Sequence, residues 1–239
     1  MFIMSCDPAV ENDVVVVNGF VVGVKDIVHV EVKRFQSGDK TAVADADVEL
    51  VLDGTAIPLS HQGEGIYSAQ LPDGSVIPGY QADINVNANR RISAKATVPP
   101  AITITSHTST TFNVSSSNSA QEVFAMNWTN RDGFSYLLQL ENLESSPVTI
   151  EFFDNPIRFE QVYAGPIEES AITLFAGDFT YYGSHRLTVY VVPEEYRDLF
   201  FFQNSGLGEL VVQGPDNVRG GFGSWNAINA EEIILTVLP

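Results

Sequence analysis

The sequence is poor in the features that cross-link a chain, carry it through a membrane or attract nucleic acid. It contains one cysteine in 239 residues, so an internal disulfide is excluded. No apolar run approaches the roughly 20 residues that a membrane-spanning helix needs. Lys and Arg together number 12 against 30 Asp and Glu, which leaves a formal net charge of −18. A field of this sign repels phosphates, so nucleic acid is not expected as a partner.

The apolar content nevertheless predicts a folded chain. Hydrophobic residues make up 44% and aromatic residues 10% of the sequence, which argues against disorder despite the acidic charge. The length fits one large or two small domains of about 100–200 residues each. A chain of this size buries roughly 70–75% of the surface that its unfolded form exposes. We therefore expect a core that needs neither disulfide nor metal.

Acidic residues dominate the second part of the chain more strongly than the first. Residues 101–239 hold 17 acids and 5 bases, all arginine, whereas residues 1–100 hold 13 acids and 7 bases. The simpler interpretation is a solvated acidic surface that keeps a secreted protein soluble. The alternative is an acidic face for a basic partner or for divalent cations.

Short β-branched runs recur along the chain and are separated by turn residues. In residues 27–35 two sets of side chains alternate, the period-2 pattern of a strand with one buried face. Asp53-Gly54 directly follows an apolar run and is a tight-turn pair. Pro99-Pro100 cannot continue a ladder and marks a boundary. Recurrent strands with few helical patterns predict an all-β chain.

Two Ig-like or fibronectin-III-like β-sandwich domains are therefore expected. The predicted ranges are a lipoprotein signal remnant and tether over 1–9, a first sandwich over 10–100 and a second sandwich over 101–239. One short helix is expected near 193–203 in the second sandwich. Pro193 suits its first turn, and two glutamates directly after Pro193 favour the positive end of the helix.

Catalytic and metal-binding motifs are missing from the sequence. It has no HExxH, CxxC, P-loop or G-x-S-x-G pattern, and no two of its four histidines stand four residues apart. We therefore predict no catalytic residue, no metal and no cofactor, and a protein that is not an enzyme. Asp45 and Asp47 would share one strand face, but this calcium candidate lacks further oxygen ligands. A pair of carboxylates from distant strands stays open as an alternative and would make the chain a glycoside hydrolase.

A glycine-rich turn near the C-terminus is the best ligand-binding candidate. Residues 220–223 do not open a helix after a strand, so a structural turn with positive φ explains them better than a phosphate cradle. Backbone donors of the turn and the Arg219 guanidinium could bind a hydroxyl or a carboxylate. Trp225 is expected to be exposed beside the turn, whereas Trp128 is expected in the core. Arg219, Phe222 and Trp225 are thus the predicted ligand-binding residues, for a glycan or a peptide.

The one cysteine lies in a segment that resembles a lipoprotein processing site. Met1-Phe2-Ile3-Met4-Ser5 places an apolar run and a small residue directly before Cys6. The acidic stretch 7–13 follows as a tether. Two or more acyl chains on Cys6 would hold the chain stably on a membrane, at about 0.8 kcal/mol for each buried CH₂. Lipidation of Cys6 is therefore predicted, and a free cysteine near a frayed terminus is the alternative.

Several landmarks follow one another in a fixed order. They are Cys6-Asp7-Pro8, the apolar strand with its glycine at 14–19, Ala46-Asp47-Val48-Glu49-Leu50 followed by Gly65-Ile66-Tyr67, the stretch 94–99, and Pro215-Asp216-Asn217-Val218-Arg219-Gly220-Gly221-Phe222-Gly223. Together they resemble the bacterial surface lipoproteins of domain of unknown function family 4249 (DUF4249). The last segment is the most specific of these landmarks.

This resemblance implies a lipid-anchored protein of the outer membrane or periplasm of a Gram-negative bacterium, working beside a TonB-dependent outer-membrane receptor. It implies no activity and no catalytic residues. Together with the missing motifs, it favours a non-enzymatic binding or accessory module. The main alternative is a structural or adhesive surface protein whose exposed strand edges pair with neighbouring chains.

Overall fold

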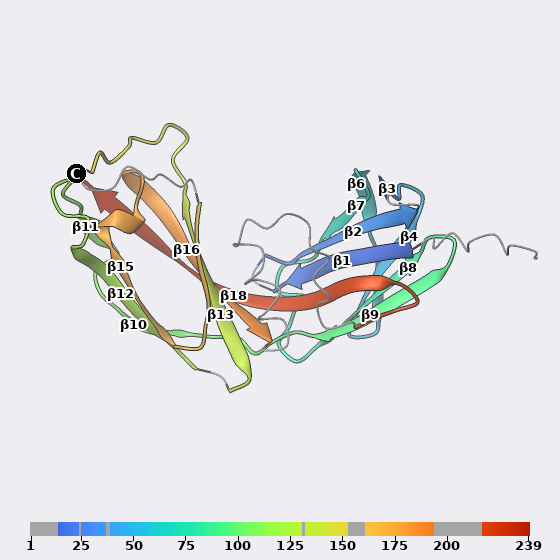
Figure 1. The fold of residues 1–239 in the computed structure, drawn as a ribbon. Helices are drawn as coiled ribbons and strands as arrows, with labels where there is room; N and C mark the ends of the chain where they lie inside the picture. The colour runs from blue at the N-terminus through green and yellow to red at the C-terminus, as the bar shows by residue number, and fades with distance from the viewer. Residues whose placement is uncertain (1–13, 24, 37–38, 131, 153–160, 194–216) are drawn as a thin grey trace, which may run out of the picture.

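The computed structural model describes residues 14–23, 25–36, 39–130, 132–152, 161–193 and 217–239. Strands dominate this part of the chain, and one 3₁₀ turn, η1 (Ala176–Asp178), interrupts them. The strands stack as two β-sandwiches that lie end to end (Figure 1). The predicted all-β sandwich class is therefore confirmed.

The first sandwich packs two sheets against each other. One layer contains β1 (Val14–Val22), β2 (Ile27–Gln36), β3 (Asp39–Ala42), β6 (Ser60–Gly63) and β7 (Ile66–Gln70). The other has the order β17 (Val218–Arg219), β9 (Arg91–Thr97), β8 (Gln81–Asn87), β4 (Asp47–Leu52) and β5 (Thr55–Pro58). Burial alternates along β4 and β8, as the period of two requires, and the inward side chains form one apolar core.

The second sandwich has a three-stranded and a larger sheet. The small sheet has the order β10 (Ile104–His107), β12 (Glu122–Trp128) and β15 (Ala171–Phe175). Facing it are β14 (Gln161–Ile167), β13 (Phe134–Asn142), β16 (Gly183–Pro193), β18 (Phe222–Leu238) and β11 (Thr111–Asn113). A separate core fills the space between the two sheets. It contains Trp128, 3% exposed, which confirms its predicted burial.

One strand belongs to both sandwiches. The first half of β18 pairs in parallel with β1, from Val16↔Phe222 to Val22↔Ile228. Its second half pairs antiparallel with β16, up to Val191↔Asn229. β18 thereby joins the two sandwiches through a single ten-stranded sheet, and Figure 1 shows it running from one to the other.

Further bonds hold the junction at the point where β18 changes partner. The Gly23 N–H donates to the Ile228 carbonyl at 2.8 Å. The buried Asn229 side chain donates from Nδ2 to the Pro99 carbonyl at 3.3 Å. The Glu232 carboxylate lies 3.6 Å from Lys25 Nζ of the first sandwich and 3.4 Å from Arg186 Nε of the second. The junction is therefore built from ladder, side-chain and ionic contacts together.

The described residues locate the sequence-predicted boundaries only in part. The first core runs up to Val98 and the second begins at Ile102, on either side of Pro99-Pro100. Val218, Trp225 and Ala227 pack in the first core, although the predicted second range, 101–239, included them. The tether 1–9 lies outside the described residues, as does the helix near 193–203 except for Pro193, which ends β16.

Candidate functional site

The structure contradicts the predicted exposure of Trp225. Its side chain is 0% exposed, and the indole Nε1 donates to the Ala82 carbonyl at 2.7 Å. The indole therefore lies between the two sheets of the first sandwich as its largest fully buried side chain. Sequence reasoning failed here because β18 is covered on both faces near the junction, so its burial does not alternate. Trp225 cannot stack on a ligand in this structure.

The residues around Trp225 form a tightly packed turn that is held by side-chain hydrogen bonds. Asn217 Oδ1 accepts from the Trp225 N–H at 3.0 Å, and Asn217 Nδ2 donates to the Trp225 carbonyl at 2.6 Å. The amide thus replaces a neighbouring strand at this point. Gly220 and Gly223 have φ of 80° and 117°, which L side chains rarely adopt, as the predicted positive-φ turn required. This turn closes the first sandwich between β9 and β1.

Arg219 and Phe222 remain at the surface. Phe222 is 49% exposed, and Arg219 lies on β17, where it pairs with Ser93 of β9. Phe222 lies beside Val16 on the neighbouring β1. With the indole directed into the core, the three predicted residues do not line one concave surface. Cys6, the predicted lipidation site, lies outside the described residues.

Within the described part of the chain, the acidic candidates do not form a metal site. Asp45 and Asp47 are exposed, and within the described residues no three His, Cys, Asp or Glu side chains lie together as metal ligands would. Glu232 is engaged by Lys25 and Arg186. Burial, and then the charge of Glu232, raise the pKa of Glu231. These two carboxylates belong to the junction between the sandwiches.

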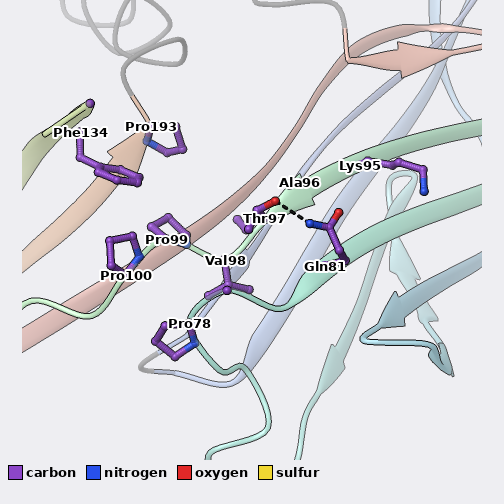
Figure 2. A pocket seen from close by; sticks show the side chains of 13 residues that line it. Pro78, Gln81, Lys95, Ala96, Thr97, Val98, Pro99, Pro100, Phe134 and Pro193 are labelled. Carbon is purple, nitrogen blue, oxygen red and sulfur yellow. Dashed lines mark hydrogen bonds between the residues drawn. The ribbon is translucent and has the colours of Figure 1, made fainter. Parts of the chain in front are cut away.

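A cleft of about 620 Å³ lies where the two sandwiches meet. Pro78, Pro99, Pro100, Pro193 and Phe134 form much of its wall, as Figure 2 shows. Its opposite end is polar, because the Gln81 amide donates to the Thr97 hydroxyl at 2.8 Å and Lys95 lies beside them. The described lining residues include one charged side chain, Lys95, and no Asp or Glu. Sequence reasoning missed it because both sandwiches contribute to it.

A buried histidine is the main titratable group in the second core. His185 is 3% exposed and packs edge-on against Phe179, with the ring centroids 5.2 Å apart. Its Nδ1 lies 3.1 Å from the Gly183 carbonyl, and its Nε2 lies 3.1 Å from Asn142 Nδ2. A neutral ring with the proton on Nδ1 satisfies both contacts, since Asn142 then donates to Nε2. Burial lowers the pKa of His185, against the opposing effects of the Gly183 carbonyl and the Glu144 charge.

Acid should therefore destabilise the second sandwich through His185. The unfolded histidine titrates near 6.5 and the folded one lower, so the unfolded state binds more protons in between. We expect the free energy of unfolding to fall as the pH drops below 6.5 towards the folded pKa. Urea unfolding at a series of pH values should show a smaller fall for His185→Gln than for the wild type. The exposed His61→Gln is the control, and equal acid sensitivity in all three proteins would contradict the prediction.

Comparisons with known proteins give structural likenesses only. No protein-family model and no curated protein matches the chain. Among solved structures it is similar to the Yersinia pseudotuberculosis adhesin InvE, at 14% identity and a TM-score of 0.25, covering 94% of this chain and 59% of that one. It is also similar to a bacterial ice-binding adhesin, at 10% identity and a TM-score of 0.25, covering 95% of this chain and 66% of that one.

A third similar structure contains immunoglobulin domains. It is the complex of Dpr11 IG1 with DIP-gamma, at 8% identity and a TM-score of 0.25, covering 94% of this chain and 96% of that one. The chain spans less than two thirds of the length of the two adhesin structures. Likenesses at this level say nothing about what the chain binds. No helix in the described part of the chain is long and apolar enough to cross a membrane.

Proposed function

We propose that the chain is a non-enzymatic, lipid-anchored protein of the cell envelope that acts as a rigid structural or adhesive surface module. The observation that carries this proposal is β18, which belongs to the sheets of both sandwiches. Its 17 residues span roughly 55 Å at about 3.3 Å per residue. Two domains joined by a flexible linker would reorient freely, whereas bending here would break ladder hydrogen bonds.

The ends of the molecule suit display from a surface. β1 begins at Val14, at the end of the first sandwich that lies away from the second (Figure 1). β18 leaves the neighbourhood of Val16 and reaches Asn113 of the second sandwich at Leu238. A lipid on Cys6 would therefore hold the first sandwich near the membrane and direct the second one outward. Such an arrangement is typical of a spacer that carries a binding surface at its far end.

A ligand-binding accessory role is the second candidate, and the junction cleft favours it. The cleft has the volume of a small-molecule site and largely apolar walls with a few polar groups at one end. In this version the chain works beside a TonB-dependent receptor, as the resemblance to DUF4249 implies. A glycan or peptide would then bind at the cleft, because Trp225 is buried.

The lipid anchor can be tested at a single atom. Because Cys6 is the one cysteine, all thioether-linked lipid on the protein must be attached to its Sγ. We expect a chain expressed behind a lipoprotein leader to incorporate a clickable palmitate analogue and to fractionate with membranes. Cys6→Ser should lose the label completely and become soluble in the periplasm. Cells that display the wild type should sediment faster as aggregates than cells that express Cys6→Ser.

Two outcomes would count against this proposal. If the exported wild type carries no lipid label, the anchor is wrong. If anchored protein neither aggregates cells nor retains them on surfaces coated with matrix proteins, the adhesive role is wrong. Labelling of Cys6→Ser at the wild-type level would place the lipid elsewhere and would also contradict the assignment.

A further inference from the structure

The outer edge of β15 presents unpaired backbone groups. The Trp128 N–H donates to the Ser170 carbonyl, so this pair is a hydrogen-bonded one. In the same register Met126↔Ile172 and Phe124↔Leu174 are the next hydrogen-bonded pairs, and alternate residues of β15 therefore bond to β12. The N–H and C=O groups of Ala171 and Thr173 consequently point away from β12. β15 is the last strand of its sheet, and nothing in the described part of the chain hydrogen-bonds these groups.

The side chains of β15 leave this edge accessible. Leu174 is buried and Ile172 packs against the second core, which fixes the inner face of the strand. Ala171, Thr173 and Phe175 are exposed on the other face. The Phe175 N–H is already bonded to Asp178 Oδ2 at 2.8 Å, which leaves its carbonyl free to accept. The edge therefore offers donors at Ala171 and Thr173 and acceptors at Ala171, Thr173 and Phe175.

The other sheet edges of the described chain carry features that discourage strand addition. Proteins protect edges with proline, charge, bulges or short strands. β5 ends in a proline, β14 contains one, and β3 carries Asp39 and Lys40. β11 and β17 are short, with three and two residues. The pairings of β6 and β10 have register shifts. β15, with the sequence Ala-Ile-Thr-Leu-Phe, has no proline, glycine or charge, and the shift in its pairing lies at its end.

Both ends of this edge are acidic. The exposed Glu168 and Glu169 lie just before β15. At its other end are Asp178 and the exposed Glu122 of β12, which is the pairing partner of Phe175. Burial raises the pKa of Asp178, against the lowering effect of the bond from Phe175. An uncharged strand flanked by carboxylates fits a strand with cationic ends.

We infer that the β15 edge binds an extended segment of a partner protein, with Lys or Arg flanking an uncharged β-branched centre, as an added strand. Main-chain bonds to Ala171 and Thr173 would supply affinity, and the flanking carboxylates would select for basic ends. A second copy of the chain fits poorly, because antiparallel pairing about Thr173 would bring the acidic ends of both copies together. The inference rests on the proposed function, because it names the class of partner that the second sandwich of an adhesive module would bind. Its test uses protein without the lipid.

The test measures binding of a labelled peptide to the unlipidated chain. The probe is fluorescein-labelled Lys-Thr-Val-Thr-Val-Thr-Lys, and its partner probe replaces both lysines by glutamate. Fluorescence anisotropy should show saturable binding of the lysine probe that weakens as salt is raised. The glutamate probe should bind roughly tenfold more weakly or not at all. Thr173→Pro removes an outward N–H and should weaken the lysine probe about tenfold or more.

A matched proline variant separates edge blocking from unfolding. Ala56 lies on β5, an edge strand of the five-stranded sheet. The Leu59 N–H donates to the Val48 carbonyl, and in this register Ile57 opposite Leu50 also bonds to β4. Alternate residues of β5 therefore bond to β4, and the N–H of Ala56 points outward. Ala56→Pro should bind the lysine probe like the wild type. Thr173→Lys keeps the N–H and should still weaken that probe by repulsion. Circular dichroism and thermal unfolding establish that all three variants are folded.

The outcomes are distinguishable from those of the anchoring experiment. Folded Thr173→Pro that binds like the wild type would overturn the inference, as would equal binding of the two probes or no binding at millimolar concentration. If the wild type dimerises and Thr173→Pro is monomeric, the edge binds a second copy of the chain. That result would overturn the inference of a partner with basic ends. None of these results depends on lipid at Cys6, so loss of the anchor would leave this inference standing.

Discussion

Replacing Trp225 by alanine should lower the free energy of unfolding by about 4 kcal/mol, although the residue adjoins a surface turn. The side chain is fully buried in the first core, so truncation leaves a cavity the size of an indole. It also removes the bond from Nε1 to the Ala82 carbonyl. Urea or guanidinium unfolding monitored by circular dichroism gives the difference directly. A loss below about 1.5 kcal/mol would mean that the indole is not a core group in solution.

The second tryptophan provides a matched control for the hydrogen bond. Trp128 is also buried, but its Nε1 has no hydrogen-bond partner. Trp225→Phe should therefore cost about 1 kcal/mol more than Trp128→Phe, because only the first change removes a bond. Equal costs would show that the Trp225 bond contributes nothing net. A larger cost for Trp128→Phe would contradict the predicted order.

Local pattern was sufficient to predict much of the fold. The alternation in residues 27–35 became β2, in which Val28, Val30 and Val32 are all 0% exposed. Asp53-Gly54 forms the predicted turn between β4 and β5, with φ of 46° and 83°. These features depend on neighbours within a few residues. A sequence carries such information directly.

The remaining features depend on contacts between distant segments. Nothing near residue 225 indicates that its strand pairs in parallel with β1, about 200 residues earlier in the chain. That pairing buries Trp225 and lets one strand serve both sandwiches. The junction cleft and the open edge of β15 likewise need the topology. The sequence did contain one usable indication of the burial of Trp225. The asparagine and the glycines of residues 217–223 are more typical of a tightly packed turn than of a ligand site.

The turn at residues 217–223 has a structural role, because its contacts hold the start of β18 in place. Asn217 bonds both backbone groups of Trp225, and a Cβ on Gly221 would lie 2.9 Å from the Val15 carbonyl. The close approach brings the chain between β9 and β1 before β18 begins its parallel pairing. The direction of β18 towards the second sandwich is thus set at this point.

Gly223→Ala should accordingly be among the most damaging single-methyl additions in the chain, lowering the free energy of unfolding by about 3 kcal/mol or more. Its φ of 117° is strained for alanine, and the added Cβ would meet the Val17 carbonyl oxygen and lie 2.8 Å from its carbon. Gly54→Ala is the control, because its φ is also positive, at 83°, but nothing lies within 4 Å of the added Cβ. That change should cost about 1 kcal/mol, from backbone conformation alone. Denaturant unfolding of both variants measures the difference, and equal losses would show that the approach of β18 to β1 is looser than the structure indicates. Because β18 also belongs to the second sandwich, Gly223→Ala should in addition increase the rate of proteolysis at the junction. Gly54→Ala should leave that rate unchanged.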